Sequence, residues 1–352
     1  MFHGARPCQD DEHIYYNAKL FNNTGQPILA QINDTRSSAI LQRACDYRCS
    51  IIRFSVNGSL LPLLVPRMIS FAPPTTAYSL TLSIGASSFA APVLFTAPQN
   101  NQIRFAYYYF NAFLEDLNAA FSAAYVGLTA LVGPLPAPQA PVMIWDPQSK
   151  LFTIAFNDSY LVPPITISMN YELFNLFQSF QARFNGYNAP FGRDYDLIIT
   201  RVNTISAIAP GSLSALASAL TPPILELQQE FSSLSNWSPV ASFYFTSYQI
   251  PVKNENLPTL SSVNQSINVS NNSLPILTDF EPLLGSDTEF NRGFSQYLPS
   301  AQYRYLTLES DISLNTIDLQ CFWTDKAGES FPLLVDLGYY MSVKILFEKI
   351  RR

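Results

Sequence analysis

The strongest pattern in this sequence lies near its C-terminal end, where apolar and polar residues alternate with a period of two. The apolar positions, in chain order, are Ile317, Leu319, Cys321, Trp323, Val343, Ile345 and Phe347. This period places the apolar side chains on one face of a β-strand. Gly328 lies in the turn-like segment between the two runs, and glycine readily adopts the positive φ that tight turns need. We therefore expect the chain to end in a closing hairpin whose last strand is held in a sheet.

The opposite face of that last strand has a different character. Lys344 and Glu348 lie on it, with Leu346 between them. Because an apolar side chain between two charged ones needs a cover of its own, we expect Leu346 to meet a neighbouring chain or a second layer of the protein.

Short apolar runs with strand character fill the first hundred residues. They lie at 14–21, 46–56, 61–71, 77–84 and 91–97. Asn, Gly, Ser and Pro separate them, and such turn residues between short strands are typical of a β-sandwich. Pro62 and Pro66 fall within one run, and proline inside a strand is typical of a sheet edge.

A helical period interrupts the strands after residue 100. Apolar residues recur at alternating steps of four and three from Ile103 to Leu128, which predicts one face of a long helix. Only Arg104, Glu115 and Asp116 are charged there, so we expect the helix to be mostly buried. Such a face can pack against the chain's own sheet or form a seam with a partner; we favour the first interpretation.

The middle of the chain mixes further strands and helices. A Pro-rich connector at 133–141 precedes the expected elements, which are strands within 143–156, a strand at 165–169, a short helix within 171–184 and a strand at 194–202. Thr221 is a suitable N-cap for a second helix with Pro222 and Pro223 in its first turn. Its apolar stripe would be Ile224, Leu227, Phe231 and Leu234.

Strands at both ends of the chain therefore flank a mixed middle. We predict a mainly β fold, a jelly-roll sandwich with an inserted mixed α/β region, because a terminal strand can pair with an early one to close the sandwich. The expected divisions are a flexible N-terminal arm at 1–12, a sandwich formed by 13–100 and 241–352, and an inserted region at 101–240.

Composition points to contacts with other surfaces. Charged residues make up 13% of the 352 residues, and Phe and Tyr together number 45. The cores of protein interfaces are also poor in charge and rich in aromatic residues, although a single aromatic-rich β core would account for the composition equally well. The net charge of −6 argues against broad binding of nucleic acid. Only the basic C-terminus, residues 344–352, offers such a contact.

Residues for common catalytic chemistry are scarce. His3 and His13 are the only histidines, and no glycine-rich phosphate loop is present. Asp194 and Asp196 form a weak candidate for a paired-carboxylate glycosidase, and a solvated strand end explains them better. The four cysteines are too sparse for a disulfide scaffold or a metal site. They are Cys8, Cys45, Cys49 and Cys321. We expect no catalytic, cofactor-binding or metal-binding residues, and no enzyme.

Membrane and export signals are also missing from the pattern. Polar residues follow Met1 instead of an apolar stretch, so we expect no secretory leader and a chain that starts in the cytoplasm. The uncharged stretches at 118–145 and 202–225 are interrupted by proline, so we expect neither to span a membrane.

Three regions together resemble the penton, or minor capsid, proteins of small eukaryotic DNA viruses such as virophages, adintoviruses and polinton-like viruses. The regions are 32–66, 145–156 with 167–186, and 322–352. Their motifs are patterns of strand and turn residues that together span most of the chain. The resemblance implies a structural jelly-roll protein of the virion that assembles as a homopentamer and closes the icosahedral vertices beside a double jelly-roll major capsid protein.

The same resemblance implies the partners and the location. The partners would be other copies of the chain, the major capsid protein and, in addition, other minor capsid proteins or a vertex fibre. The chain would be made in the host cytoplasm and assemble in the cytoplasm or the nucleus. A different class of function is a lectin-like sandwich that binds a receptor or carbohydrate through exposed aromatic side chains. The three tryptophans, Trp145, Trp237 and Trp323, lie in apolar contexts, where core packing is the commoner role.

Overall fold

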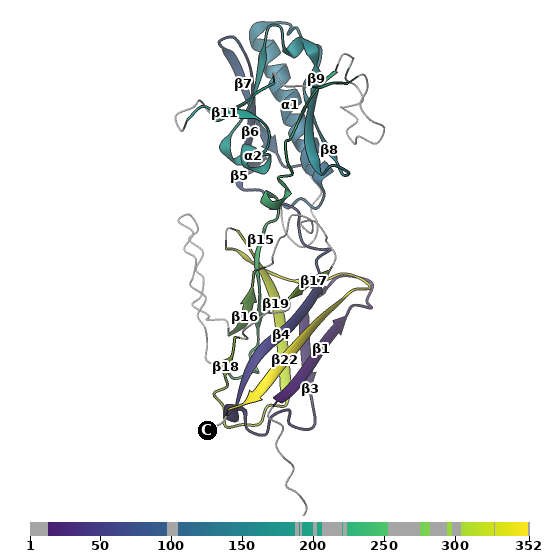
Figure 1. Cartoon of the computed structure of the whole chain (residues 1–352), viewed down its shortest axis with the longest axis vertical. Helices are drawn as coiled ribbons and strands as arrows, with labels where there is room; N and C mark the ends of the chain where they lie inside the picture. The colour runs from purple at the N-terminus through teal and green to yellow at the C-terminus, as the bar shows by residue number, and fades with distance from the viewer. Residues whose placement is uncertain are drawn as a thin grey trace, which may run out of the picture. The chain divides into compact units, whose positions relative to one another are not determined.

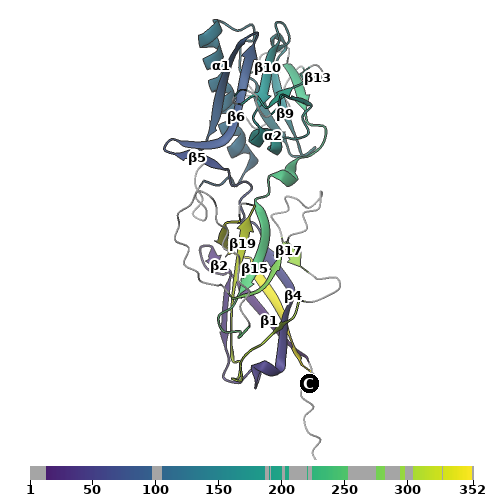
Figure 2. The ribbon, with the colours of Figure 1, turned by 90° about the vertical axis from the view of Figure 1, so that its left-hand side faces the viewer.

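The chain divides into two compact units in a computed structural model (Figures 1 and 2). One unit combines Met1–Leu61 with Val240–Arg352, and the other is Pro62–Pro239. The structure describes residues 13–96, 105–186, 190, 192–199, 203–205, 220, 224–252, 275–281, 294–297, 304–326 and 328–350. The expected arm at 1–12 lies outside them. The first boundary falls after residue 61 and not after residue 100, so the strands between 62 and 96 belong to the second unit.

The first unit is a sandwich of two antiparallel sheets. The β4 sheet consists, in order, of β1 (His13–Phe21), β22 (Tyr340–Lys349), β4 (Tyr47–Asn57) and β17 (Phe294–Tyr297), with β18 (Leu306–Thr307) also on β4. The β19 sheet consists of β16 (Ile276–Phe280), β15 (Val240–Thr246), β19 (Thr316–Asp325) and β20 (Ser330–Pro332), with β3 (Gln31–Thr35) also on β19. A short pair links β2 (Ile28–Leu29) and β21 (Leu334–Val335). A 3-10 turn, η1 (Ala44–Asp46), leads into β4.

Aromatic side chains fill the space between these two sheets. The ring of Phe54 on β4 lies 4.8 Å from that of Phe245 and 6.0 Å from that of Phe243, both on β15. It also stacks on Phe280 of β16 at 5.9 Å. Since these contacts cross from one sheet to the other, they form the sandwich core, and the prediction of a mainly β jelly-roll fold is confirmed.

The alternation at the C-terminal end is confirmed, but the closing hairpin is wrong. Val343, Ile345 and Phe347 are buried in the core, as are the alternating apolar residues of β19, which are Ile317, Leu319, Cys321 and Trp323. However, β22 pairs with β1 and β4, whereas β19 lies in the opposite sheet. The reason is the turn after β19, where Gly328 at a φ of 85° returns the chain into β20 and not into β22.

The second unit contains two further antiparallel sheets and the long helix. The β6 sheet consists, in order, of β11 (Ala182–Phe184), β12 (Tyr195–Leu197), β10 (Ile165–Met169), β6 (Pro74–Ile84) and β5 (Met68–Phe71), with β7 (Ser87–Leu94) also on β6. The β9 sheet consists of β13 (Asn203–Ile205), β14 (Ile224–Gln228), β9 (Leu151–Asn157) and β8 (Val142–Asp146). Helix α1 (Phe110–Val132) packs against β6, β7 and β8 (Figure 1). The shorter helical elements are α2 (Tyr171–Leu176), η2 (Asp158–Tyr160) and η4 (Leu234–Asn236).

A cluster of aromatic rings around Trp237 forms the core of the second unit. Phe113 of α1, Phe152 of β9 and Phe177 after α2 have ring centroids 5.1 to 5.5 Å from that of Trp237. The indole Nε1 donates to the backbone oxygen of Leu176 at 3.0 Å, so the polar atom of this buried side chain is paired.

Helix α1 agrees with its predicted position but differs in its bounds and its cover. It begins at Phe110, while Ile103 lies outside the described residues, and it ends at Val132 because Gly133 adopts a φ of 85°. One face is exposed, and Val126 on it is 65% exposed. The expectation of burial on most sides is therefore wrong for this face, because the two sheets of the unit pack against the opposite side of the helix.

The second predicted helix is also wrong. Ile224, Leu227 and their neighbours form strand β14, which pairs with β9 on one side and β13 on the other. Phe231, which the helical stripe would bury, is exposed. A short apolar run does not distinguish helix from strand, and here the backbone hydrogen bonds to the two neighbouring strands decide the outcome.

Candidate assembly surface

The thiol and histidine side chains of the described residues do not gather into a reactive site. Cys45, Cys49 and Cys321 are free, and burial raises the pKa of the Cys49 thiol to about 12. Burial also raises the pKa of Cys321, so both thiols stay protonated and unreactive. Within the described ranges, no three His, Cys, Asp or Glu side chains are grouped so that they could hold a metal ion. His3 and Cys8 lie outside those ranges.

The two aspartates considered as a carboxylate pair have separate structural roles. Asp196 on β12 accepts a hydrogen bond from Ser168 Oγ on β10 at 2.5 Å. Asp194 accepts from the backbone N–H of Tyr171 at the start of α2, at 2.8 Å. Asp196 therefore joins β12 to β10, and Asp194 joins the residues before β12 to the start of α2.

The tryptophans do not form a sugar-binding surface. Trp237 and Trp323 are buried, so their rings cannot stack on a ligand. Only Trp145 is half-buried, and its ring packs against Phe110 and Phe152, with centroids 4.6 Å away in each case. A lectin-like function is therefore not favoured.

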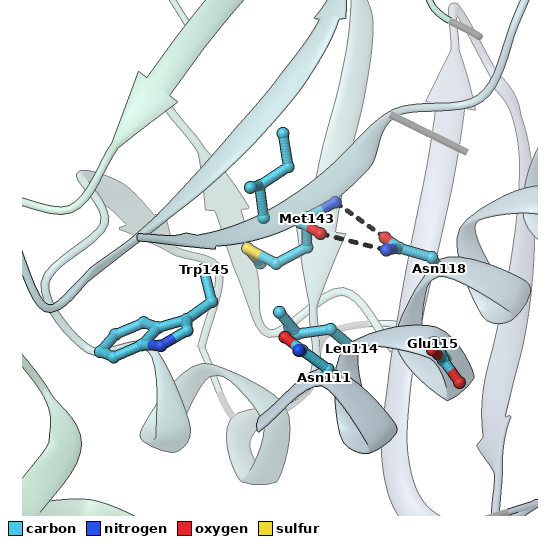
Figure 3. A pocket seen from close by; sticks show the side chains of 7 residues that line it. Asn111, Leu114, Glu115, Asn118, Met143 and Trp145 are labelled. Carbon is cyan, nitrogen blue, oxygen red and sulfur yellow. Dashed lines mark hydrogen bonds between the residues drawn. The ribbon is translucent and has the colours of Figure 1, made fainter. Parts of the chain in front are cut away.

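A shallow pocket opens between α1 and the edge strand β8 (Figure 3). Its empty volume, including space open to solvent, is about 240 Å³, and its lining residues are Asn111, Leu114, Glu115, Asn118, Met143, Ile144 and Trp145. Asn118 Nδ2 donates to the backbone oxygen of Met143 at 3.0 Å, and the Met143 N–H donates to Asn118 Oδ1 at 2.7 Å. The amide thus replaces a neighbouring strand at this edge. Glu115 is the single titratable group in the lining, so the pocket holds no acid pair.

A second surface has more charge. The outer face of the β4 sheet, which we call the basic face, consists of side chains of β1, β22 and β4 that point away from the sandwich core. Its members are His13, Tyr15, Asn17, Lys19, Phe21, Tyr340, Ser342, Lys344, Leu346, Glu348, Arg48, Ser50, Arg53 and Ser55. Four of these members are Lys or Arg, namely Lys19, Arg48, Arg53 and Lys344, and a single member, Glu348, is an acid. In a chain with a net charge of −6, this face is locally positive.

The single acid is already paired at one end of the basic face. Arg48 donates to Glu348 through Nε and Nη2 at 3.1 and 3.0 Å, and His13 Nε2 lies 3.9 Å from the other carboxylate oxygen. The hydrogen bonds from Arg48 hold the pKa of Glu348 below its usual value. The central cations of the face, Lys19, Arg53 and Lys344, therefore gain no compensation from this carboxylate.

Tyrosine rings hold two of these cations in place. Lys344 Nζ lies 4.6 Å from the ring centroid of Tyr15, and Lys19 Nζ lies 4.3 Å from that of Tyr340. An ammonium group over a ring face is attracted by the ring quadrupole and loses part of its freedom. Leu346, which lies opposite Tyr15, is 4% exposed in the single chain, so a neighbouring chain is not needed to cover it.

Sequence reasoning noted the basic C-terminus but missed the basic face. The alternation along β1 and β22 was visible, and it places Lys19 and Lys344 on polar sides of their strands. That these two residues meet depends on the register of β1 against β22, in which Asn17 lies opposite Lys344 and Lys19 opposite Ser342. A register between strands at opposite ends of the chain leaves no local signal in the sequence.

None of the helices in the part of the chain that the structure describes is long and apolar enough to cross a membrane.

Comparison with known proteins places the chain among viral structural proteins. The family described as Sputnik minor capsid protein V18/19 matches residues 14–349. Structural protein V19 of Sputnik virophage is 28% identical over 201 residues, which make up 57% of this chain and 88% of that protein. A chain in the cryo-EM structure of the Sputnik virophage superimposes with a TM-score of 0.74 at 22% identity, covering 96% of this chain and 98% of that one. The crystallised mavirus penton protein superimposes with a TM-score of 0.67 at 18% identity, covering 96% and 99%.

The structural likenesses extend over nearly the whole chain, so both units of the fold are shared and not only the common sandwich. The family match begins at the second residue of β1 and ends at the last residue of β22, the two strands that lie side by side in the β4 sheet. This chain belongs to the family of the Sputnik minor capsid protein V18/19 and is a structural protein of the virion.

Proposed function

We propose that this minor capsid protein forms a homopentameric penton that closes the icosahedral vertices of the virion beside a double jelly-roll major capsid protein. The observation that carries the proposal is the superposition of the mavirus penton protein on 96% of this chain, together with membership of a minor capsid family. We further propose that the protein has no catalytic activity and works by shape and contact alone.

The surface properties of the chain support an assembly role. Few residues are charged, and large apolar side chains are exposed on both units, among them Tyr15, Leu29, Ile69, Phe71 and Val126. Burying such side chains against a neighbour is favourable by about 25 cal/mol for each Å² of apolar area removed from water. A subunit of a closed ring needs two different surfaces of this kind, because each copy meets one neighbour on each side.

The proposal extends to partners and location. The chain would contact the major capsid protein around the vertex and, in addition, other minor capsid proteins or a vertex fibre. It would be made in the host cytoplasm, with assembly there or in the nucleus.

Electron cryomicroscopy of particles assembled from this chain and its virus's major capsid protein tests the vertex role. The expected result is density with the two-unit fold of this chain at every fivefold position. A matched preparation without the chain should give particles with open vertices. Closed vertices in that preparation, or density for this chain on the facets alone, would contradict the proposal.

A further inference from the structure

We propose that the basic face of one subunit binds the acidic segment at residues 10–12 of a second copy of this chain. The segment reads Asp10, Asp11, Glu12 and immediately precedes β1. The inference rests on the proposed homopentamer and deepens it by naming the segment and the surface that join two copies.

The cations at the centre of the basic face form no ion pair with a carboxylate in the described part of the chain. Lys344 lies directly opposite Arg53 in the register of β22 against β4. Like charges that face each other across a strand pair are destabilising. Among the described residues, no carboxylate forms an ion pair with Lys19, Arg53 or Lys344. A face whose three central cations have no carboxylate partner among the residues that the structure describes is suited to an acidic ligand from outside the subunit.

The arrangement of the lysines favours a ligand with carboxylates. Tyr15 and Tyr340 each hold one ammonium group over a ring, which reduces the conformational freedom that binding would otherwise remove. Tyr15 is itself 54% exposed, so the pair of lysine and ring lies at the surface, where an incoming segment reaches it.

The number of cations on the basic face and the negative charge of the whole chain favour an acidic peptide over nucleic acid as the ligand. Three central cations match the three acids of residues 10–12, whereas the long polyanion of a nucleic acid extends beyond this face and is repelled by a chain whose net charge is −6. The interaction would be electrostatic and partly exposed, so salt weakens it.

The direction of β1 favours an acidic segment that comes from a second copy of the chain and not from the same copy. His13, the first residue of β1, lies opposite Glu348 at the end of the face, and Lys344 lies opposite Asn17, four residues further along. At about 3.3 Å per residue, the subunit's own segment would have to turn back over roughly 13 Å to reach Lys344. The segment of a neighbouring subunit approaches without such a reversal.

The test measures binding of a labelled peptide of residues 1–13, with Cys8→Ser, to the full-length chain. The receptor carries Asp10→Asn, Asp11→Asn and Glu12→Gln, so that the segments of other receptor copies do not compete with the peptide. In fluorescence anisotropy at low salt, we expect saturable binding that weakens as salt increases. Lys19→Glu with Lys344→Glu in the receptor should weaken binding at least tenfold, whereas the matched control, Lys150→Glu with Arg183→Glu in the second unit, should leave it unchanged.

Rescue separates a charge effect from misfolding. A peptide carrying Asp10→Lys, Asp11→Lys and Glu12→Lys should bind the charge-reversed receptor and not the unreversed one. Equal binding to both receptors, or no binding to either, would overturn the inference. Tighter competition by a single-stranded oligonucleotide than by the acidic peptide would overturn it in favour of nucleic acid. Native mass measurements on the unaltered chain keep the two proposals apart, because a pentamer without peptide binding removes only this inference.

Discussion

The two units of the protein differ in how the chain builds them. In the first unit, β22 from the end of the chain lies between β1 and β4 from its beginning. The second unit uses the continuous stretch Pro62–Pro239 and contains the helices α1 and α2. Both have aromatic cores, around Phe54 in the first and Trp237 in the second. The first unit therefore depends on residues far apart in sequence, whereas the sheets and helices of the second unit come from one continuous segment.

Each unit also contains a buried aspartate that fixes a loop by accepting several hydrogen bonds. In the first unit, Asp318 on β19 accepts hydrogen bonds from Ser247 Oγ at 2.5 Å and from the backbone N–H of Gln249 at 2.8 Å. In the second, Asp116 on α1 accepts from Tyr107 O–H at 2.6 Å and from the backbone N–H of Thr96 at 2.9 Å. A buried carboxylate is tolerated in both places because several donors satisfy it.

Deleting residues 342–352 should have the largest effect. It removes most of β22 and leaves backbone groups of β1 and β4 unpaired, so the full chain should become insoluble or fail to assemble. Residues 62–239 expressed alone should still unfold in one cooperative transition, measured by circular dichroism. Soluble, assembled protein after the deletion would show that β22 is an appendage and would remove the contrast between the units.

A single core substitution probes the same strand more gently. Phe347→Ala should destabilise the first unit by about 3 to 5 kcal/mol, the range for a buried aromatic side chain. Denaturant unfolding, monitored with a separate spectroscopic signal for each unit, should show this loss of stability only in the transition of the first unit. A shift of both transitions together would mean that the units unfold as one.

Helix α1 offers a matched pair within the second unit. Leu114→Ala should cost about 2 to 5 kcal/mol because Leu114 is buried against the unit's own core. Val126→Ala on the exposed side of the same helix should stay within about 0.5 kcal/mol in the isolated subunit. Equal losses at the two positions would show that α1 is covered on both sides.

The ion pair of Glu348 should give a small effect, and one that depends on pH. Because Arg48 lowers the folded-state pKa of Glu348, the pair stabilises the fold above the unfolded-state pKa of about 4.3, and this contribution is lost as pH falls through the folded-state pKa. Glu348→Gln should therefore lower stability by about 0.2 to 1 kcal/mol at pH 7, the range for exposed pairs, and by less at pH 3. A difference that is the same at both pH values would assign the effect to packing.

The sequence predicted local structure better than the pairing of distant segments. The buried faces of β19 and β22 followed from their alternation, but their placement in opposite sheets depends on pairings with β1, β4 and β15, which no local pattern encodes. The sequence also did not predict the boundary at residue 61, because similar turn residues separate the strands on both sides of it. The helix expected from Thr221 failed because the apolar run around Ile224 and Leu227 is short, and a short apolar run does not distinguish a helix from a strand that is buried on both faces.

The sequence predicted that the chain contacts other proteins, but not which surface it would use. Low charge and many aromatic residues indicated contacts with other proteins. The basic face needs Lys19, Arg53 and Lys344 to meet, and these residues come from three strands whose order only the folded sheet determines.

Native mass spectrometry of the purified full-length chain tests whether it forms a pentamer. We expect one dominant species of about 197 kDa, which is five times the 39.3 kDa of a single chain. The measurement should be made across a range of protein concentrations, so that a weak ring is not mistaken for a monomer. A species that remains at 39.3 kDa at all concentrations, or a dominant trimer, would contradict the proposed penton.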